Sequence, residues 1–181
     1  MTTLANSRIW PAALVAGTLF LAASFGATAL AHDADEETRV SGNLENFDDL
    51  DFNVFTGQKW DELHRSHAED IVVHWPDGHT TEGIDVHIED LAAMFVYAPD
   101  TRILVHPIKF GSGEWTAVMG VMEGTFTEPM PTGNGNFIQP TGKAFEIGMV
   151  TLGRWNEDGT MAEEFLMWDN LTFMRQIGLA D

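Results

Sequence analysis

The sequence predicts an α+β fold in which three helices pack against one curved antiparallel sheet. Helical periodicity dominates the chain up to residue 97, whereas residues 101–170 consist mainly of long β-type runs. These runs contain Gly120, Gly148 and Gly153, and internal glycines favour a sheet that bends strongly. Helices lying across the mouth of a bent sheet would enclose a pocket.

Residues 1–31 resemble an export signal. Arg8 is the only charged side chain among them, residues 12–25 are apolar, and Ala29-Leu30-Ala31 has the small-x-small pattern of a cleavage site. We expect cleavage after Ala31, export to the periplasm or the medium, and no membrane association afterwards. An uncleaved membrane anchor is the alternative, because about 20 apolar residues can span a bilayer. Residues 32–42 are charged and lack apolar periodicity, which predicts a disordered acidic tail.

A helical pattern begins at Asn43, a suitable N-cap, and continues to Glu69 with a break near Gly57. Residues 83–97 form the next predicted helix, and residues 171–177 a closing helical turn. The helical stripes consist of Leu44, Phe47, Leu50, Val54, Trp60, Leu63 and His67 in the first segment, and Ile84, Ile88, Leu91 and Phe95 in the second.

Five strands are expected, at residues 71–75, 101–111, 114–126, 142–155 and 160–170. Asp158-Gly159 indicates a hairpin turn between the last two. Residues 127–140 are rich in Pro and Gly and are interpreted as a loop. With no repeat and no linker, residues 43–181 are predicted to form one domain.

The charge of the chain restricts its partners. The net charge is −19, and all 28 acidic residues follow residue 31. Such a chain would repel nucleic acid phosphates and an anionic membrane surface. With no Cys, thiol chemistry and disulfides are excluded. His64 and His67 have a spacing that can bind zinc on a helix, but no third and fourth ligand is evident, so no metal and no cofactor are predicted. His79 and His87 are interpreted as surface residues.

Several short motifs follow one another in an order typical of one family. They are Trp60…His64…Ala68-Glu69-Asp70, Val73-His74-Trp75-Pro76, Pro99-Asp100, Gly124-Thr125, Pro140-Thr141-Gly142-Lys143, Arg154-Trp155, Asp158-Gly159, Glu164-Phe165, Asp169 and Gln176-Ile177-Gly178. Over residues 60–179 the chain resembles the SnoaL-like polyketide cyclases, or ester cyclases, of the nuclear-transport-factor-2-like superfamily.

The resemblance implies a cone-shaped fold, with a curved antiparallel sheet wrapped around helices and an internal pocket. It also implies an intramolecular aldol condensation that needs no metal or cofactor, with an Asp as general acid and base. By position Asp169 matches that Asp. Phe126 stands where the family often has His, and Phe165 where it usually has Trp.

Asp169 is therefore the first candidate catalytic residue. In a strand it shares a face with Phe165 and Met167, and burial among apolar side chains would make its carboxylate more basic. The alternative is that Asp169 caps the helix that follows it. His74 is the second candidate, either orienting a substrate carbonyl or sharing a proton with Asp169, and the alternative is a hydrogen-bonded core His.

Six residues are candidates for binding the substrate: Phe165, Met167, Trp60, His106, Met119 and Phe126. His106 could line the cavity or lie on the outside of the sheet. We expect an acid/base enzyme acting on a small apolar carbonyl compound, or a non-catalytic binding protein that uses the same cavity. A homodimer is predicted through the outer face of the sheet, because Val118, Met119, Val121 and Met122 make both faces of one strand apolar.

Overall fold

The computed structural model describes residues 20–181, with side chains described from residue 34 onward. It divides into two compact units, residues 1–35 and 36–181, and the fold below is that of the second. The expected signal falls on residues 1–31, whose side chains lie outside this description, so cleavage after Ala31 stays a prediction. Within the described part of the chain, no helix is long and apolar enough to cross a membrane.

Helix α1 (Phe20–Asp49) leads directly into a short π-helix, η1 (Leu50–Phe55). The predicted apolar stripe is confirmed, since Phe47, Leu50 and Val54 are buried. The predicted disorder of residues 32–42 is wrong, because these residues belong to α1. Glu36 accepts a hydrogen bond from the Gly113 amide at 2.7 Å. This hydrogen bond supports the helix even though the sequence there has no helical spacing of apolar residues.

The predicted break near Gly57 is confirmed. A side chain at Gly57 would lie 2.4 Å from the Asn53 carbonyl oxygen, so only glycine fits this turn. A 3-10 helix, η2 (Trp60–Arg65), follows, and the chain then enters strand β1 (His67–His74), which begins four residues earlier than expected. His67 is therefore a strand residue, and the helical pairing of His64 with His67 is wrong.

The main sheet has seven strands in the order β2-β1-β9-β8-β5-β3, with β4 also paired to β5. β1 runs parallel to β9, and all the other pairs are antiparallel. The long strands agree with the prediction. The bounds are β2 Thr80–Glu82, β3 Arg102–Ile103, β4 Ile108–Ser112, β5 Trp115–Thr125, β8 Ala144–Trp155 and β9 Met161–Trp168.

Two predicted segments differ in detail. The expected strand 101–111 is split into β3 and β4, and residues 104–107 belong to neither; among them Pro107 has no amide hydrogen to donate to the ladder. The expected loop 127–140 contains a small hairpin of β6 (Met130–Pro131) and β7 (Phe137–Ile138). Gly133 and Gly135 have positive φ angles in its turn, a conformation that favours glycine.

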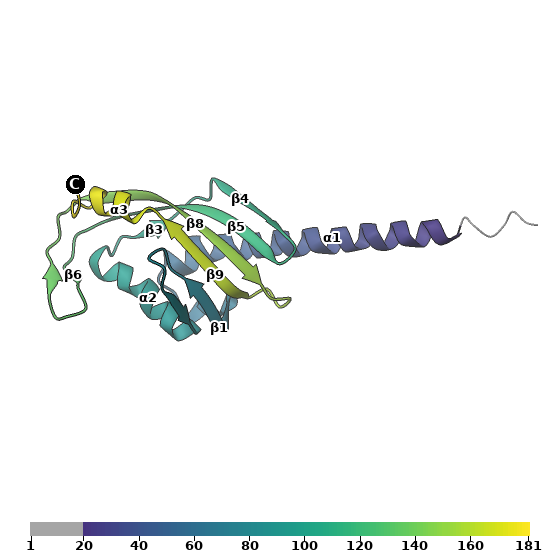
Figure 1. Cartoon of the computed structure of the whole chain (residues 1–181), viewed down its shortest axis with the longest axis horizontal. Helices are drawn as coiled ribbons and strands as arrows, with labels where there is room; N and C mark the ends of the chain where they lie inside the picture. The colour runs from purple at the N-terminus through teal and green to yellow at the C-terminus, as the bar shows by residue number, and fades with distance from the viewer. Residues whose placement is uncertain (1–19) are drawn as a thin grey trace, which may run out of the picture. The chain divides into compact units, whose positions relative to one another are not determined.

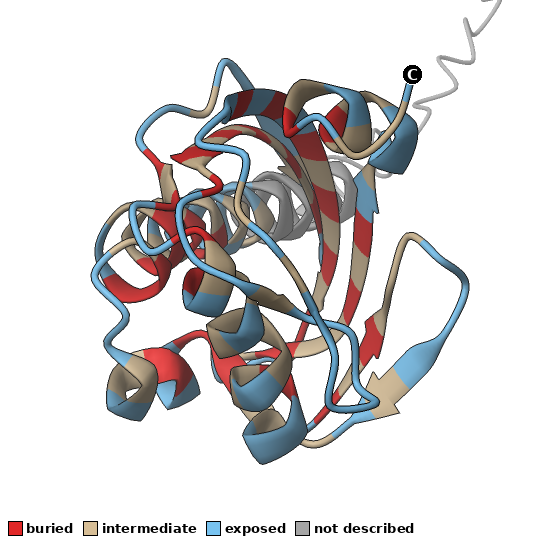
Figure 2. Cartoon of the chain, turned by 90° about the vertical axis from the view of Figure 1, so that its left-hand side faces the viewer, coloured by how far each residue is buried: buried red, intermediate tan, exposed pale blue. Residues whose placement is uncertain are grey.

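The helices lie on the inner, concave face of the sheet (Figures 1 and 2). α2 (Ile84–Tyr97) and η1 pack against this face, and α3 (Asn170–Gln176) packs against β8. Buried and more exposed residues alternate along β5 and β8, as the banded colours of these strands show (Figure 2). The α+β architecture with a curved, unclosed sheet is therefore the one that the sequence predicts.

Candidate functional site

An interior cavity of about 30 Å³ lies between the inner face of the sheet and the helices. Its wall is mostly apolar. A second hollow of about 160 Å³ adjoins it, since the two share Trp75, Met94, Met122 and Trp168. The polar residues in the wall of the first cavity are few: Asp51, His67, His87, Thr151 and Glu164.

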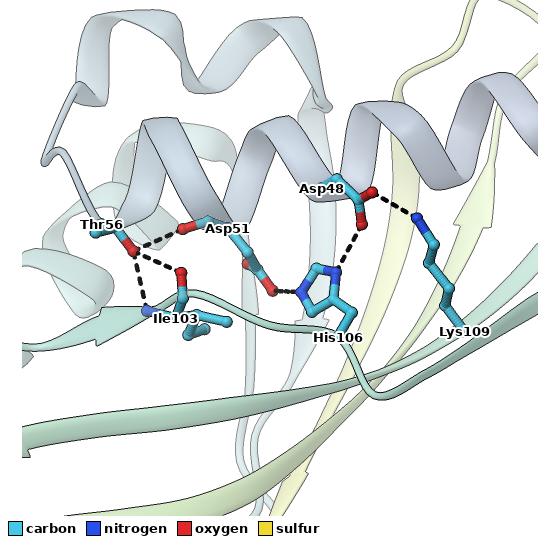
Figure 3. Close-up of polar contacts among 6 residues, drawn as sticks. All are labelled: Asp48, Asp51, Thr56, Ile103, His106 and Lys109. Carbon is cyan, nitrogen blue, oxygen red and sulfur yellow. Dashed lines mark hydrogen bonds and ion pairs between the residues drawn. The ribbon is translucent and has the colours of Figure 1, made fainter.

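Asp51 belongs to a chain of polar contacts that leads from the cavity toward the surface (Figure 3). Its carboxylate lies 2.8 Å from His106 Nε2, and His106 Nδ1 lies 2.8 Å from Asp48 Oδ1. Asp48 also pairs with the Lys109 ammonium. The side chains of His106 and Asp51 are 2% and 9% exposed, whereas those of Asp48 and Lys109 are about one-third exposed.

Local structure explains why these groups meet. Asp48 and Asp51 are three residues apart and lie on one face where α1 passes into η1. His106 comes from the segment that leaves the sheet between β3 and β4 (Figure 3). The space beside it is free because Gly120 on β5 has no side chain: an added Cβ would lie 3.5 Å from the His106 ring and 3.7 Å from the Asp51 carboxylate.

Thr56 holds the end of η1 in place. Its hydroxyl lies 2.8 Å from the Asp51 carbonyl oxygen and accepts a hydrogen bond from the Ile103 amide at 3.0 Å (Figure 3). The π-helix that carries Asp51 is thereby tied to β3, the strand that leads to His106. π-helical turns are rare and are often found at functional sites.

The two central groups of this chain have shifted pKa values. Burial raises the pKa of Asp51, and the hydrogen bond and charge of His106 offset only part of this effect. Burial would lower the pKa of His106, but Asp51 and Asp48 outweigh it, so the pKa is raised. Both groups therefore bind a proton more tightly than they would in water, and the Asp51 carboxylate is the more basic for its burial.

His67, His87 and Glu164 form a second polar cluster in the cavity wall. They come from β1, α2 and β9, and they are 2%, 1% and 4% exposed. Glu164 Oε2 lies 3.3 Å from His87 Nε2 and 3.8 Å from His67 Nε2. Burial alone would raise the pKa of Glu164, but the two neighbouring rings outweigh it and lower the pKa to about 2. Burial lowers the pKa of His67.

Asp169 does not lie in an apolar cavity, so the predicted surroundings are wrong. It is exposed and caps α3, accepting hydrogen bonds from the Leu171 and Thr172 amides at 3.0 and 3.1 Å. The Thr172 hydroxyl donates a further bond at 2.7 Å, and these bonds lower the pKa of Asp169. The capping alternative describes this geometry.

The second catalytic candidate, His74, and the substrate-binding candidate Phe165 both lie on the outer face of the sheet. The two rings stack with their centres 4.1 Å apart, and His74 Nε2 lies 2.9 Å from Glu163 Oε1. Met167, on the same face, is 43% exposed. The sequence-based prediction placed the wrong face of β9 toward the cavity. The residues of β9 that line the cavity are Glu164, Leu166 and Trp168.

The remaining candidates are also away from the cavity wall. Trp60 packs against Phe55 and Phe95 at the edge of the core. Met119 lies over Gly148 on the outer face, where an added Cβ would meet its methyl group. Phe126 is fully buried beside Tyr97. Among the substrate-binding candidates, only His106 takes part in the polar contacts around Asp51. Its ring faces α1 and η1 rather than the outside of the sheet.

Sequence reasoning missed Asp51, His67, His87 and Glu164. His67 was assigned to a helix and His87 to the surface, and Glu164 served only as a family landmark. The alternation in β9 offered one usable signal, because its other parity also combines a carboxylate, Glu164, with the apolar Leu166 and Trp168. Nothing in the spacing of His67 and His87 indicates that β1 and α2 bring them together.

The fold and its interior cavity define an α+β protein of the nuclear-transport-factor-2-like class. The chain belongs to the SnoaL-like polyketide cyclase family, whose family model matches residues 39–177. A search of curated proteins gave no match.

Solved structures share the fold at low sequence identity. A candidate SnoaL-like polyketide cyclase from Jannaschia sp. CCS1 superposes with a TM-score of 0.67 at 20% identity, covering 78% of this chain and 95% of its own. IdmH, a candidate polyketide cyclase from Streptomyces antibioticus, gives 0.63 at 21% identity, with coverages of 75% and 98%. A protein of ketosteroid isomerase-like fold from Catenulispora acidiphila, in complex with trimethylamine, gives 0.55 at 16% identity, with coverages of 70% and 87%.

Proposed function

We propose that this protein is an acid/base enzyme acting on a small, largely apolar carbonyl compound in the interior cavity, with Asp51 exchanging the proton. One observation carries the proposal. A buried carboxylate in an apolar wall is linked through His106 and Asp48 to Lys109 near the surface. A proton taken up in the cavity can thus be passed outward without opening the site.

The surroundings of Asp51 suit a general base. A carboxylate withdrawn from water binds a proton more tightly than one at the surface, and this brings its pKa closer to neutral pH. The raised pKa of Asp51 agrees with this role. His106 would hold the proton in turn and orient the Asp51 carboxylate, as the supporting residues of catalytic bases do.

The family relationship suggests an aldol-type reaction. Asp51 would remove a proton from the carbon next to a carbonyl group. The resulting enolate carbon would bond to a second carbonyl carbon of the same molecule, and the alkoxide formed there would take a proton back. The free space of about 30 Å³ and the adjoining hollow of about 160 Å³ favour a compact substrate.

The test is proton exchange, which needs no knowledge of the natural substrate. The full-length chain is incubated in D₂O with small apolar ketones and diketones, and loss of the proton next to the carbonyl is followed by NMR. We expect wild-type protein to accelerate exchange, and Asp51→Asn to reduce the rate by about a hundredfold or more while ligand affinity and fold are kept.

Two outcomes would contradict the proposal. Unchanged exchange in Asp51→Asn would remove Asp51 from the mechanism. Tight binding of these compounds without any exchange would favour the non-catalytic binding protein. Export is a further part of the proposal, and the intact mass of protein recovered from the periplasm or the medium should correspond to a chain beginning at His32.

A further inference from the structure

The His67, His87 and Glu164 side chains leave buried polar atoms without a hydrogen-bond partner. These atoms are His67 Nε2, His87 Nδ1 and Glu164 Oε2. A buried polar atom without a partner destabilises the fold, so such atoms are rare in folded proteins and call for an explanation. Two of them, His67 Nε2 and Glu164 Oε2, face one another at 3.8 Å.

The hydrogen bonds of Ser66 identify which His67 nitrogen carries the proton. The Ser66 hydroxyl donates to the Leu63 carbonyl oxygen at 3.1 Å, and its oxygen lies 2.9 Å from His67 Nδ1. Because the hydroxyl hydrogen is already used, His67 Nδ1–H is the donor to Ser66 Oγ. His67 Nε2 then presents a lone pair toward the lone pairs of Glu164. Two facing lone pairs repel one another unless a proton or a metal ion lies between them.

From these contacts we infer that His67, His87 and Glu164 bind a divalent transition-metal ion. One ligand atom from each residue lies within 4.8 Å of the others. Tetrahedral zinc with bonds of about 2.0–2.2 Å holds its ligand atoms about 3.4 Å apart. The distances of 3.3 and 3.8 Å from Glu164 are close to this value, and the His67 and His87 ligand atoms, within 4.8 Å of one another, would move together to reach it.

The set of ligands indicates the class of ion. Two imidazoles and one carboxylate are typical of zinc and iron(II) sites that keep open coordination positions, and differ from the all-oxygen sites of Mg²⁺ and Ca²⁺. The three residues lie in the cavity wall, so the open positions would face the cavity. Ser66 supplies the hydrogen bond that metal-ligating His residues usually make through their second nitrogen.

Zinc binding by the purified full-length chain tests this inference without a substrate. After treatment with a chelator, we expect titration calorimetry to show one tight equivalent of Zn²⁺, and Co²⁺ to give the visible absorption of a nitrogen- and oxygen-ligated ion. Loss of a supporting partner weakens metal binding by about 10–100-fold. We expect a larger loss of Zn²⁺ affinity in each of the ligand variants His67→Gln, His87→Gln and Glu164→Gln. Ser66→Ala should weaken binding by about 10–100-fold.

The exposed His64 provides the matched control, since it lies at the surface and its ring bonds to the nearby Asp61 carbonyl oxygen at 2.8 Å. His64→Gln should bind Zn²⁺ as the wild type does. Zn²⁺ should also raise the melting temperature of wild-type protein but not of the folded ligand variants, as ligands that bind only the native state do. The inference is overturned if folded wild-type protein binds no equivalent of Zn²⁺, or if binding survives in all three ligand variants.

Discussion

Asp169 accepts hydrogen bonds from two backbone amides and one hydroxyl in the first turn of α3. Capping of this kind satisfies amides that have no partner within the helix. We predict that Asp169→Ala lowers the melting temperature, whereas Asp169→Asn stays close to wild type, because Asn caps nearly as well. Thermal unfolding followed by circular dichroism measures both.

The pH dependence of this cap follows from its lowered pKa. A carboxyl group whose pKa is lower in the folded state stabilises the fold above its ordinary value of 3.8, and this contribution is lost as the pH falls through the lowered pKa. The difference between wild type and Asp169→Ala should therefore shrink in acid. A difference that grows as the pH falls would contradict the capping role.

The opposite dependence of stability on pH is expected for His106. Its pKa is raised in the folded state, so its stabilisation is complete below the ordinary value of 6.5 and is lost as the pH rises through the raised value. We predict that His106→Gln lowers the free energy of unfolding by about 1–3 kcal/mol at pH 6, since it removes hydrogen bonds to buried or half-buried carboxylates. Denaturant unfolding across the pH range should show the deficit decreasing in alkaline solution, and a deficit that increases there would contradict the assignment.

At the scale of single residues, the sequence predicted the types of side chain in the candidate site, Asp and His, better than their positions. His106 was singled out and lies between Asp48 and Asp51, although it neither lines the first cavity nor lies on the outside of the sheet. Asp51 could not be singled out from the sequence, because helical periodicity identifies only apolar residues. It does not distinguish a buried acid next to such a stripe from an acid at the surface. The pairing of β1 with β9, which brings His67 near Glu164, is a long-range contact that local patterns cannot predict.

Among the elements, β5 has a specific requirement at Gly120. An added Cβ there would lie 3.2 Å from Ile103, closer than side chains usually pack, and in ordinary contact with the His106 ring at 3.5 Å. We predict that Gly120→Ala lowers the free energy of unfolding by about 1–3 kcal/mol through overpacking. The control is Gly42→Ala in α1, where nothing lies within 4 Å of the added Cβ.

Gly42→Ala should instead stabilise the protein by about 0.5–1 kcal/mol, because alanine is the better helix former. Urea unfolding of both variants provides the comparison. Equal effects of the two changes would show that Gly120 has no special role beside His106.

The elements themselves were largely predictable, because apolar alternation and helical spacing identified the long strands and α2. The errors lie where tertiary contacts override local pattern. Residues 36–42 are helical although they lack apolar spacing, since Glu36 bonds to the Gly113 amide on the turn between β4 and β5. The strand predicted at 101–111 is interrupted before Pro107, and His106 leaves the sheet there to reach Asp48 and Asp51.

For the whole molecule, a homodimer through the outer face of the sheet stays a prediction. Ile108, Phe110 and Trp115 on this face are 55%, 64% and 39% exposed, an apolar group large enough to favour association. We expect wild-type protein to sediment as a dimer at micromolar concentration and Phe110→Glu to sediment as a monomer. A wild-type monomer under these conditions would exclude the dimer.

We propose that the interior cavity, and not the Asp169 cap of α3, is the site of chemistry. The most direct measurement compares Asp51→Asn and Asp169→Asn in the ketone exchange assay. We predict that Asp51→Asn lowers the exchange rate by about a hundredfold or more, while Asp169→Asn exchanges at the wild-type rate. The reverse result, with exchange lost in Asp169→Asn and kept in Asp51→Asn, would contradict it.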